Sequence, residues 1–457
     1  MRYSKNVTDN RVDTSGPTRR RLKVLVIAEA ANPEWVSVPL VGWSMANALR
    51  EFADVHIVTQ VRNGNAFGRA GLTEGHDFTA IDTEKLAAPA HKLAGLLRGG
   101  KGKGWTFVTA ISTLIYPYFE RQIWKKFGAA IIRGEYDIVH RVTPLSPTTP
   151  SPIAKKCRSA GVPFVLGPLN GGLPWPAGFD SDRRKEREWL SYVRGLYRLL
   201  PNRTATLKAA SVIVAGSRHT ASEIPAQFAG KVVFMPENGI DPARFSKVAS
   251  APDSRALRLC FIGRLVPYKG PDMALQAALP LLREKRAHFD IIGSGPMEDQ
   301  LRALVAAEKI EDAVTFHGWV EQERVQEIAT ASQIFVFPSV REFGGGAVLE
   351  AMALGLVPVV VDYGGPGELV ALAGGIAVPL ASRDEIVAKV REILLELVDD
   401  ERRLLSISAS ARTWAMGHMT WRAKARAMLA IYEAAIDRPA VPPLGPDYGK
   451  RETSHPE

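Results

Sequence analysis

The chain has 457 residues, 46% hydrophobic and 23% charged, the balance of a globular protein with a full core rather than of a disordered or fibrous chain. That length exceeds one ordinary core and predicts two domains of roughly 200 residues each, with a cleft between them. The two cysteines, Cys157 and Cys260, lie far apart with no partner at metal-ligand spacing, which argues against a disulfide framework and a zinc site.

The formal net charge of +10 is concentrated in the N-terminal half. Residues 1–23, 91–133 and 182–208 hold seven Lys and Arg against two acids, eight against one and eight against three, so the remainder is net negative. One interpretation is an anionic partner, either a phosphate-bearing acceptor or an anionic membrane surface; the other, of equal weight, is a solvated face. We expect no nucleic-acid partner.

The first residues are basic but contain no apolar segment of the signal-peptide type, which predicts a cytoplasmic protein. The uncharged, largely apolar run from Gly104 to Phe119 has 16 residues and contains Pro117, which is short of the ~20 apolar residues that a membrane-spanning helix needs. Any membrane association is therefore expected to be peripheral, at the inner face of the membrane.

From Leu22 onward, short β-branched runs alternate with segments of helical length, the pattern of βαβ units and a parallel sheet. The fold class predicted is α/β, and a polar stretch from Asp241 to Arg255 is expected to link the two halves. The expected strands are Leu22–Ala28, Asp54–Thr59, Asp137–His140, Val162–Gly167 and Ser211–Ala215 in the first sheet, and Leu257–Gly263, His288–Gly293, Val314–Gly318, Ile334–Ser339 and Pro358–Asp362 in the second.

Two cations follow the first strand of the second half, where an open parallel sheet binds its ligands. Arg264 and Lys269 lie in a loop bounded by Gly263 and Gly270. Arginine offers a rigid fork to phosphate oxygens and lysine a point charge, while glycine lets the backbone approach a ligand closely, so the loop suits a diphosphate. A pair of solvated surface cations is the alternative.

Two carboxylates flank a glycine run further along, in Glu342-Phe-Gly-Gly-Gly-Ala-Val-Leu-Glu350. The glycines make one continuous helix improbable, so we expect a loop that carries Glu342 and then a helix that starts near Gly345, with its free N–H groups facing an anion. Glu350 would then lie about one turn inside that helix, directed toward a ribose. The alternative is an exposed Glu342 and a structural Glu350.

The stretch from Phe261 to Leu369 resembles the donor-binding domain of the family 4 glycosyltransferases, retaining enzymes of the two-Rossmann (GT-B) type. The matching pieces are GRLVPYKG, DIIGSGP, VTFHGWV and FPSVREFGGGAVLEAMALGLVPVVVDYGG, in the family's order and spacing. There is one departure: many members read Glu-Gly-Phe-Gly where this chain reads Glu342-Phe-Gly-Gly, which moves the aromatic ring.

The resemblance implies a site for a nucleotide diphosphate sugar, which is a co-substrate. No other cofactor or metal is expected, because no metal-binding Asp-x-Asp occurs in a suitable loop. The implied contacts are Glu342 to the donor sugar, Glu350 to the ribose, Arg264 and Lys269 to the diphosphate, the backbone near Gly318 and Trp319 to the base, and the amides of Gly345, Gly346 and Ala347 to the phosphates.

The N-terminal half resembles the family through two shorter features. Gly42, in Val41-Gly42-Trp43, lies where members place a glycine loop that approaches the donor phosphate. His140 ends an expected strand where members often read His-x-His, although the second position here is Val142. A histidine at a strand's carboxyl end suits a catalytic cleft, and a core histidine with satisfied ring nitrogens is equally compatible.

The resemblance implies a glycosyltransferase with a saccharide or lipid-linked acceptor, in polysaccharide or glycolipid synthesis. The alternatives are a nucleotide-sugar epimerase of the same architecture and a non-catalytic nucleotide-sugar binding protein. The expected segments are a disordered basic N-terminus at 1–21, an N-terminal Rossmann-like acceptor domain at 22–240, a C-terminal Rossmann-like donor domain at 256–418, a terminal helix at 419–438 that crosses back to the N-terminal domain, and a disordered tail at 439–457.

Overall fold

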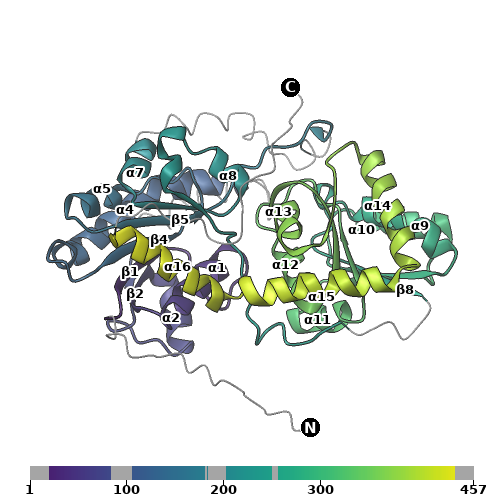
Figure 1. The fold of residues 1–457 in the computed structure, drawn as a ribbon, viewed down its shortest axis with the longest axis horizontal. Helices are drawn as coiled ribbons and strands as arrows, with labels where there is room; N and C mark the ends of the chain where they lie inside the picture. The colour runs from purple at the N-terminus through teal and green to yellow at the C-terminus, as the bar shows by residue number, and fades with distance from the viewer. Residues whose placement is uncertain (1–19, 84–104, 181–182, 184–201, 250–255, 438–457) are drawn as a thin grey trace, which may run out of the picture.

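The structure is a computed structural model that describes residues 20–83, 105–180, 183, 202–249 and 256–437. These residues form two parallel β-sheets, each covered by helices, in two lobes joined side by side (Figure 1). The predicted α/β class with two Rossmann-like halves is confirmed. The expected tail at 439–457 and nearly all of the expected N-terminus at 1–21 lie outside the described residues.

The N-terminal sheet has the order β3-β2-β1-β4-β5-β6-β7, with every neighbouring pair parallel. Successive residues of its interior strand Lys23–Ala28 face opposite layers: Val24 and Val26 join one apolar cluster, while Leu25 and Ile27 join another. The strands are β1 (Lys23–Ala28), β2 (Asp54–Gln60), β3 (Phe78–Ile81), β4 (Ile138–Thr143), β5 (Phe164–Leu169), β6 (Val212–Ala215) and β7 (Val232–Phe234).

The helices of this half cover both faces of the sheet (Figure 1). They are α1 (Val38–Leu49), α2 (Val61–Arg69), α4 (Trp105–Ile132), α5 (Pro152–Ser159), α7 (Arg203–Ala209), α8 (Arg218–Ser222) and the 3-10 helix η2 (Ala226–Lys231). Among the described residues, no helix is both long enough and apolar enough to cross a bilayer.

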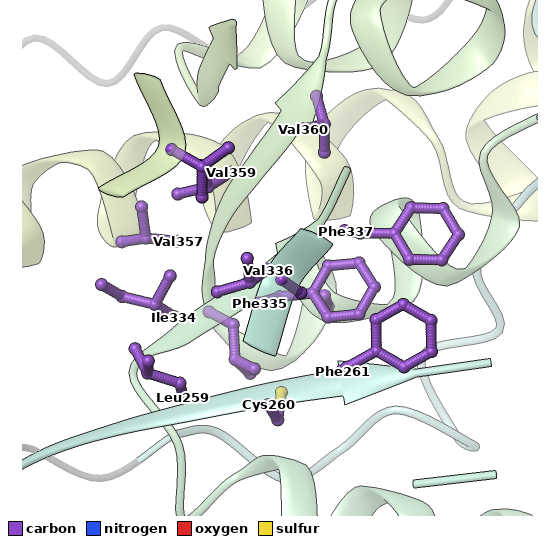
Figure 2. Packing of buried hydrophobic residues seen from close by; sticks show 14 of the residues in the cluster. Leu259, Cys260, Phe261, Ile334, Phe335, Val336, Phe337, Val357, Val359 and Val360 are labelled. Carbon is purple, nitrogen blue, oxygen red and sulfur yellow. The ribbon is translucent and has the colours of Figure 1, made fainter. Parts of the chain in front are cut away.

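The C-terminal sheet has the order β10-β9-β8-β11-β12-β13. Three phenylalanine rings from β8 and β11 fill its core: the Phe337 centroid lies 5.3 Å from that of Phe335 and 5.6 Å from that of Phe261 (Figure 2). The strands are β8 (Leu257–Ile262), β9 (Ala287–Ile292), β10 (Val314–Gly318), β11 (Ile334–Phe337), β12 (Val357–Val361) and β13 (Ile376–Val378).

The helices of the C-terminal half begin and end at recognisable signals. Ser382 and Glu385 form a reciprocal capping box at the start of α14, and Gly355 in the left-handed conformation ends α12. The helices are η3 (Pro267–Lys269), α9 (Pro271–Arg283), α10 (Glu298–Glu308), α11 (Gln322–Ala329), α12 (Gly346–Leu354), α13 (Gly364–Ala373), α14 (Arg383–Val398), α15 (Glu401–His418) and α16 (Trp421–Asp437).

Helices α15 and α16 follow one another along the molecule, α15 on the C-terminal lobe and α16 on the N-terminal lobe (Figure 1). The apolar face of α16 enters the core of the N-terminal sheet through Met428, Ile431 and Tyr432. At the crossing point Ile240 and Thr420 form an isolated bridge. The last described helix therefore completes the core of the first half of the chain.

Candidate functional site

The loops after β8 and β11 lie side by side where the strand order of the C-terminal sheet reverses. From β8 the chain passes to β9 on one side, and from β11 it passes to β12 on the other, which leaves a crevice at the carboxyl ends of the strands. Arg264 and Lys269 follow β8, and Glu342 follows β11. The sequence-predicted residues are therefore brought to the point where such sheets bind ligands.

Glycines form the rim of this crevice. Gly263, Gly293 and Gly318 end three neighbouring strands, and the Gly293 N–H donates to the Gly318 carbonyl at 2.8 Å. A Cβ atom at Gly293 would lie 2.0 Å from the Gly263 carbonyl oxygen. The glycines thus allow three backbone segments to pack in direct contact, with no side chain standing between them and a ligand.

Lys269 and Glu342 join the two loops. The Lys269 Nζ lies 3.0 Å from Glu342 Oε2, and both side chains are largely buried. Burial disfavours the charged ammonium, but the Glu342 carboxylate more than offsets it, so the pKa of Lys269 is raised. Arg264 is exposed in the same loop. The crevice therefore holds a lysine whose charged form is favoured and an arginine beside one carboxylate.

The glycine run after Glu342 turns the chain into α12. Gly345 has a left-handed φ of 61° and is the N-cap, so the helix begins at Gly346. A Cβ atom at Gly345 would lie 2.9 Å from the Leu369 side chain and 3.0 Å from the Pro366 nitrogen. The first amides of a helix lack intrahelical partners, so Gly346 and Ala347 present N–H groups and the positive end of the helix dipole at the crevice.

Glu350 lies about one turn inside α12 and is mostly buried. Burial raises the pKa of Glu350 to about 7, and Arg244, before the second sheet, acts in the opposite direction. The Arg244 guanidinium donates to the side-chain oxygen of Gln322 on α11. A carboxylate, an arginine and an amide side chain thus gather beside the crevice.

Trp319 follows the end of β10 and is 71% exposed. The preceding Gly318 has a left-handed φ of 66° and faces open space. This loop therefore offers an accessible flat surface at the outer end of the crevice.

His140 lies in the interior rather than in the crevice. Strand β4 continues to Thr143, so His140 is in mid-strand, and its side chain is 0% exposed. Its Nε2 donates to the Gly167 carbonyl at 2.6 Å, and its Nδ1 accepts from the Tyr432 hydroxyl at 2.7 Å. Burial lowers the pKa of His140 to about 4. The catalytic assignment is corrected in favour of the core histidine with both ring nitrogens satisfied.

Gly42 also differs from its expected place. It lies within α1 rather than in a loop, and a Cβ atom there would be 2.2 Å from the Ala30 carbonyl oxygen and 3.0 Å from the Thr143 methyl group. Glycine is needed here because α1 crosses close over the end of β1. Gly42 is buried, so the close packing of α1 accounts for the glycine, and a contact with the donor phosphate stays a prediction.

Two features of the crevice were not found from the sequence. Trp175, which follows β5, reaches the other half, where the Arg341 guanidinium carbon lies 4.9 Å from its ring centroid and 5.3 Å from that of Phe343. The displaced aromatic of the Glu342-Phe-Gly-Gly sequence thus packs around Arg341. Glu237, after β7, contacts the glycine run at Gly344. Both contacts join residues far apart in sequence, and no motif marks them.

A separate cavity of about 640 Å³ opens at the amino edge of the N-terminal sheet, lined by Arg158, Lys231 and the end of α16 among others. It lies at the N-terminal sheet, whereas the crevice lies at the C-terminal sheet, and none of the predicted site residues lines it. Among the described residues, no group of three or more His, Cys, Asp or Glu side chains is arranged to hold a metal ion.

Residues 244–410 match the family described as "Glycosyl transferases group 1". This range includes Arg264, Lys269, Glu342 and Glu350, and the whole of the stretch from Phe261 to Leu369.

Curated relatives share a minority of their residues with this chain. The 2-deoxystreptamine glucosyltransferase of Streptomyces kanamyceticus is 26% identical over 245 residues, which are 51% of this chain and 62% of that protein. A glycogen synthase of Mycobacterium tuberculosis is 32% identical over 43% of this chain and 47% of its own length. A D-inositol 3-phosphate glycosyltransferase of Arthrobacter is 29% identical over 67% of this chain and 72% of its own length. The chain thus spans between 47% and 72% of the length of these relatives.

Solved structures share the arrangement of both halves. Anabaena Alr3699/HepE in complex with UDP superposes with a TM-score of 0.58 at 14% identity, over 90% of this chain and 100% of that one. A glycosyltransferase from Rickettsia africae superposes with a TM-score of 0.56 at 14% identity, over 92% of this chain and 100% of that one. At this identity the likeness shows the fold, which is the GT-B arrangement of two Rossmann-like domains.

Proposed function

We propose that this chain is a retaining glycosyltransferase of family 4 that transfers a sugar from a nucleoside diphosphate sugar to a saccharide or lipid-linked acceptor. The observation that carries the proposal is the juxtaposition of Lys269, Glu342 and the start of α12 at the switch point of the C-terminal sheet. Cations and helix amides suit a diphosphate, and a carboxylate beside them suits the hydroxyls of a sugar. The relatives named as glucosyltransferase, glycogen synthase and glycosyltransferase support it.

Each group of the crevice has a proposed role toward the donor. Arg264, Lys269 and the amides of Gly345, Gly346 and Ala347 bind the diphosphate. Glu342 accepts hydrogen bonds from the sugar, and Glu350 from the ribose. The backbone at Gly318 and the exposed Trp319 contact the base. In this assignment the C-terminal half is the donor domain and the N-terminal half the acceptor domain.

The proposed chemistry depends on stabilising the leaving group. The acceptor hydroxyl oxygen forms a bond to the anomeric carbon on the face from which the diphosphate departs, the carbon–oxygen bond to the diphosphate breaks, and its electron pair leaves with the phosphate. The acceptor proton passes to a phosphate oxygen. Lys269, Arg264 and the dipole of α12 stabilise the charge that develops on the diphosphate, and this proposal requires no metal ion.

The test has a binding stage and a turnover stage. Thermal shift with UDP, GDP and ADP sugars should reveal one preferred nucleotide, since a ligand at ~100 times its Kd adds about 2.7 kcal/mol of stability. With that donor, NMR of the product should show an α-linked sugar from an α-linked donor only when acceptor is present. A change of the sugar's configuration in the absence of acceptor would establish the epimerase alternative. Donor binding without turnover on a broad acceptor panel would establish the non-catalytic binding protein.

A further inference from the structure

Glu237 lies against the glycine run of the crevice from the other half of the chain. It follows β7 at the carboxyl edge of the N-terminal sheet. A Cβ atom at Gly344 would lie 2.2 Å from Glu237 Oε1 and 2.4 Å from Asn238 Nδ2. The Glu237 carboxyl and the Asn238 amide therefore occupy the space that a side chain at position 344 would take, two residues after Glu342.

The loop that carries Glu237 is held from two directions. The buried Lys424 of α16 donates from its Nζ to the carbonyls of Pro236 and Asn238, the latter at 2.6 Å. On the other side, a Cβ atom at Gly216 would lie 3.1 Å from the Asn170 Cβ and 3.4 Å from the Glu237 Cβ. Because the loop is clamped at its backbone and packed at its side, the carboxyl of Glu237 has little freedom to move away from Gly344.

The charges around Glu237 are those of Lys424 on α16 and Glu342 on the facing loop, with the Asn170 amide beside its carboxyl. Burial together with Glu342 raises the pKa of Glu237 to about 7, and Asn170 and Lys424 oppose this. Glu342 is paired with Lys269, which reduces its repulsion of Glu237. A second carboxyl group is thus kept close to Glu342 despite the electrostatic cost.

We propose that Glu237 is a positioning residue for the donor sugar: by filling the space over Gly344 it fixes the path of residues 342–344 and the direction of Glu342. This rests on the proposed function of Glu342. The contact between Glu237 and Gly344 also accounts for the order Glu-Phe-Gly-Gly. An aromatic ring at position 344 would collide with Glu237 and Asn238, whereas the ring at position 343 packs beside Arg341. Lys424 connects this loop to the helix that crosses between the domains.

The test is a double-mutant cycle in full-length protein. Gly344 has no left-handed φ, so Gly344→Ala acts through contact rather than backbone strain. It should raise the Kd of the donor about tenfold while changing the Kd of the free nucleoside diphosphate less than threefold. Glu237→Ala should weaken donor binding similarly, Glu237→Gln should keep affinity within threefold because it keeps the shape, and the double variant Glu237→Ala/Gly344→Ala should bind better than Gly344→Ala alone.

Gly417→Ala is the matched control, since nothing lies within 4 Å of its Cβ position on α15, and it should change neither Kd. Additive losses in the double variant, or equal losses for donor and free nucleotide, would overturn the positioning role. A wild-type protein that binds no nucleoside diphosphate or nucleotide sugar would instead overturn the proposed function, and a stability cycle by urea unfolding would still show whether Glu237 and Gly344 are coupled.

Discussion

The Nζ atom of Lys269 lies 3.0 Å from Oε2 of Glu342, so the loops after β8 and β11 are joined by an ion pair at the switch point of the C-terminal sheet. The pair aligns one group assigned to the diphosphate with one assigned to the sugar. In the proposed assignment, Lys269 both attracts the phosphate and holds the Glu342 carboxylate in place. Loss of Lys269 should therefore affect the binding of both the diphosphate and the sugar.

Lys269→Ala and Arg264→Ala should each lower kcat by roughly 100-fold to 1,000-fold, which is the effect of removing one preorganised hydrogen-bond donor to a developing negative charge. Lys269→Ala should also raise the donor KM, because Glu342 loses its partner. Steady-state kinetics with the preferred donor measures both. Lys247→Ala removes a surface cation that pairs with Glu327 and is the control. Near-normal turnover in both site variants would refute their assignment.

Glu342→Gln and Glu350→Gln should separate in calorimetry. Glu350→Gln loses a ribose contact, so it should weaken the free nucleoside diphosphate and the donor alike. Glu342→Gln should weaken only the sugar-bearing donor. If Glu342→Gln weakens the free nucleotide as much as Glu350→Gln does, the two roles have been exchanged.

The raised pKa of Glu350, about 7, makes ligand-free stability depend on pH. The unfolded chain releases this proton near 4.3 and the folded state retains it to about 7, so unfolding becomes easier as pH rises through that window. Glu350→Gln removes this cost and should stabilise the protein by up to about 3.5 kcal/mol at pH 8 and by little at pH 4.5. Urea unfolding at the two pH values tests it, with the exposed Glu392→Gln as control. An equal gain at both values would contradict the pKa.

His140→Phe should reduce stability rather than chemistry. It removes the hydrogen bonds to Tyr432 and Gly167, and leaving their buried groups unpaired costs on the order of 2 kcal/mol or more. Tyr432→Phe, which loses only one of these bonds, should cost about 1 kcal/mol. At a temperature where each variant is folded, kcat should stay within a few-fold of wild type. A hundredfold loss of kcat with an unchanged Tm would restore His140 to the catalytic set.

Peripheral association with an anionic membrane stays a prediction, because the basic segments that motivate it lie largely outside the described residues, among them Lys101, Lys103, Arg194 and Arg198. Each Lys or Arg near such a surface contributes about 1 kcal/mol. Co-sedimentation should require anionic lipid, weaken as salt rises, and fall when these four residues become Glu. Equal recovery in the supernatant with anionic and neutral vesicles at low salt would support the solvated face instead.

The sequence predicted the central strands because their β-branched runs are long enough to be recognised. It missed β3, β7 and β13, which have only three or four residues and lie at or near the sheet edges. Lys269 and Glu342 were found because each loop follows a predicted strand, and parallel strands bring such loops together.

Other residues required the tertiary structure. His140 was placed at a strand end, but β4 continues for three residues, and the Tyr432 that bonds its ring lies 292 positions later. A glycine such as Gly42 is expected in a loop that approaches a ligand, but a helix that crosses close over the end of a strand requires glycine as well. Glu237 carries no motif, and only the approach of the two domains brings it to Gly344.

The position of α16 also has a consequence for synthesis of the chain. Met428, Ile431 and Tyr432 belong to the core that the N-terminal sheet begins to form with Val24 and Val26. While the ribosome is still making the C-terminal sheet, that face of the emerged N-terminal sheet stays exposed to water or to chaperones. The C-terminal core, by contrast, is made almost entirely of residues from its own half of the chain. The domain made first is therefore the last to complete its folding, and premature termination before α16 leaves an apolar surface prone to aggregation.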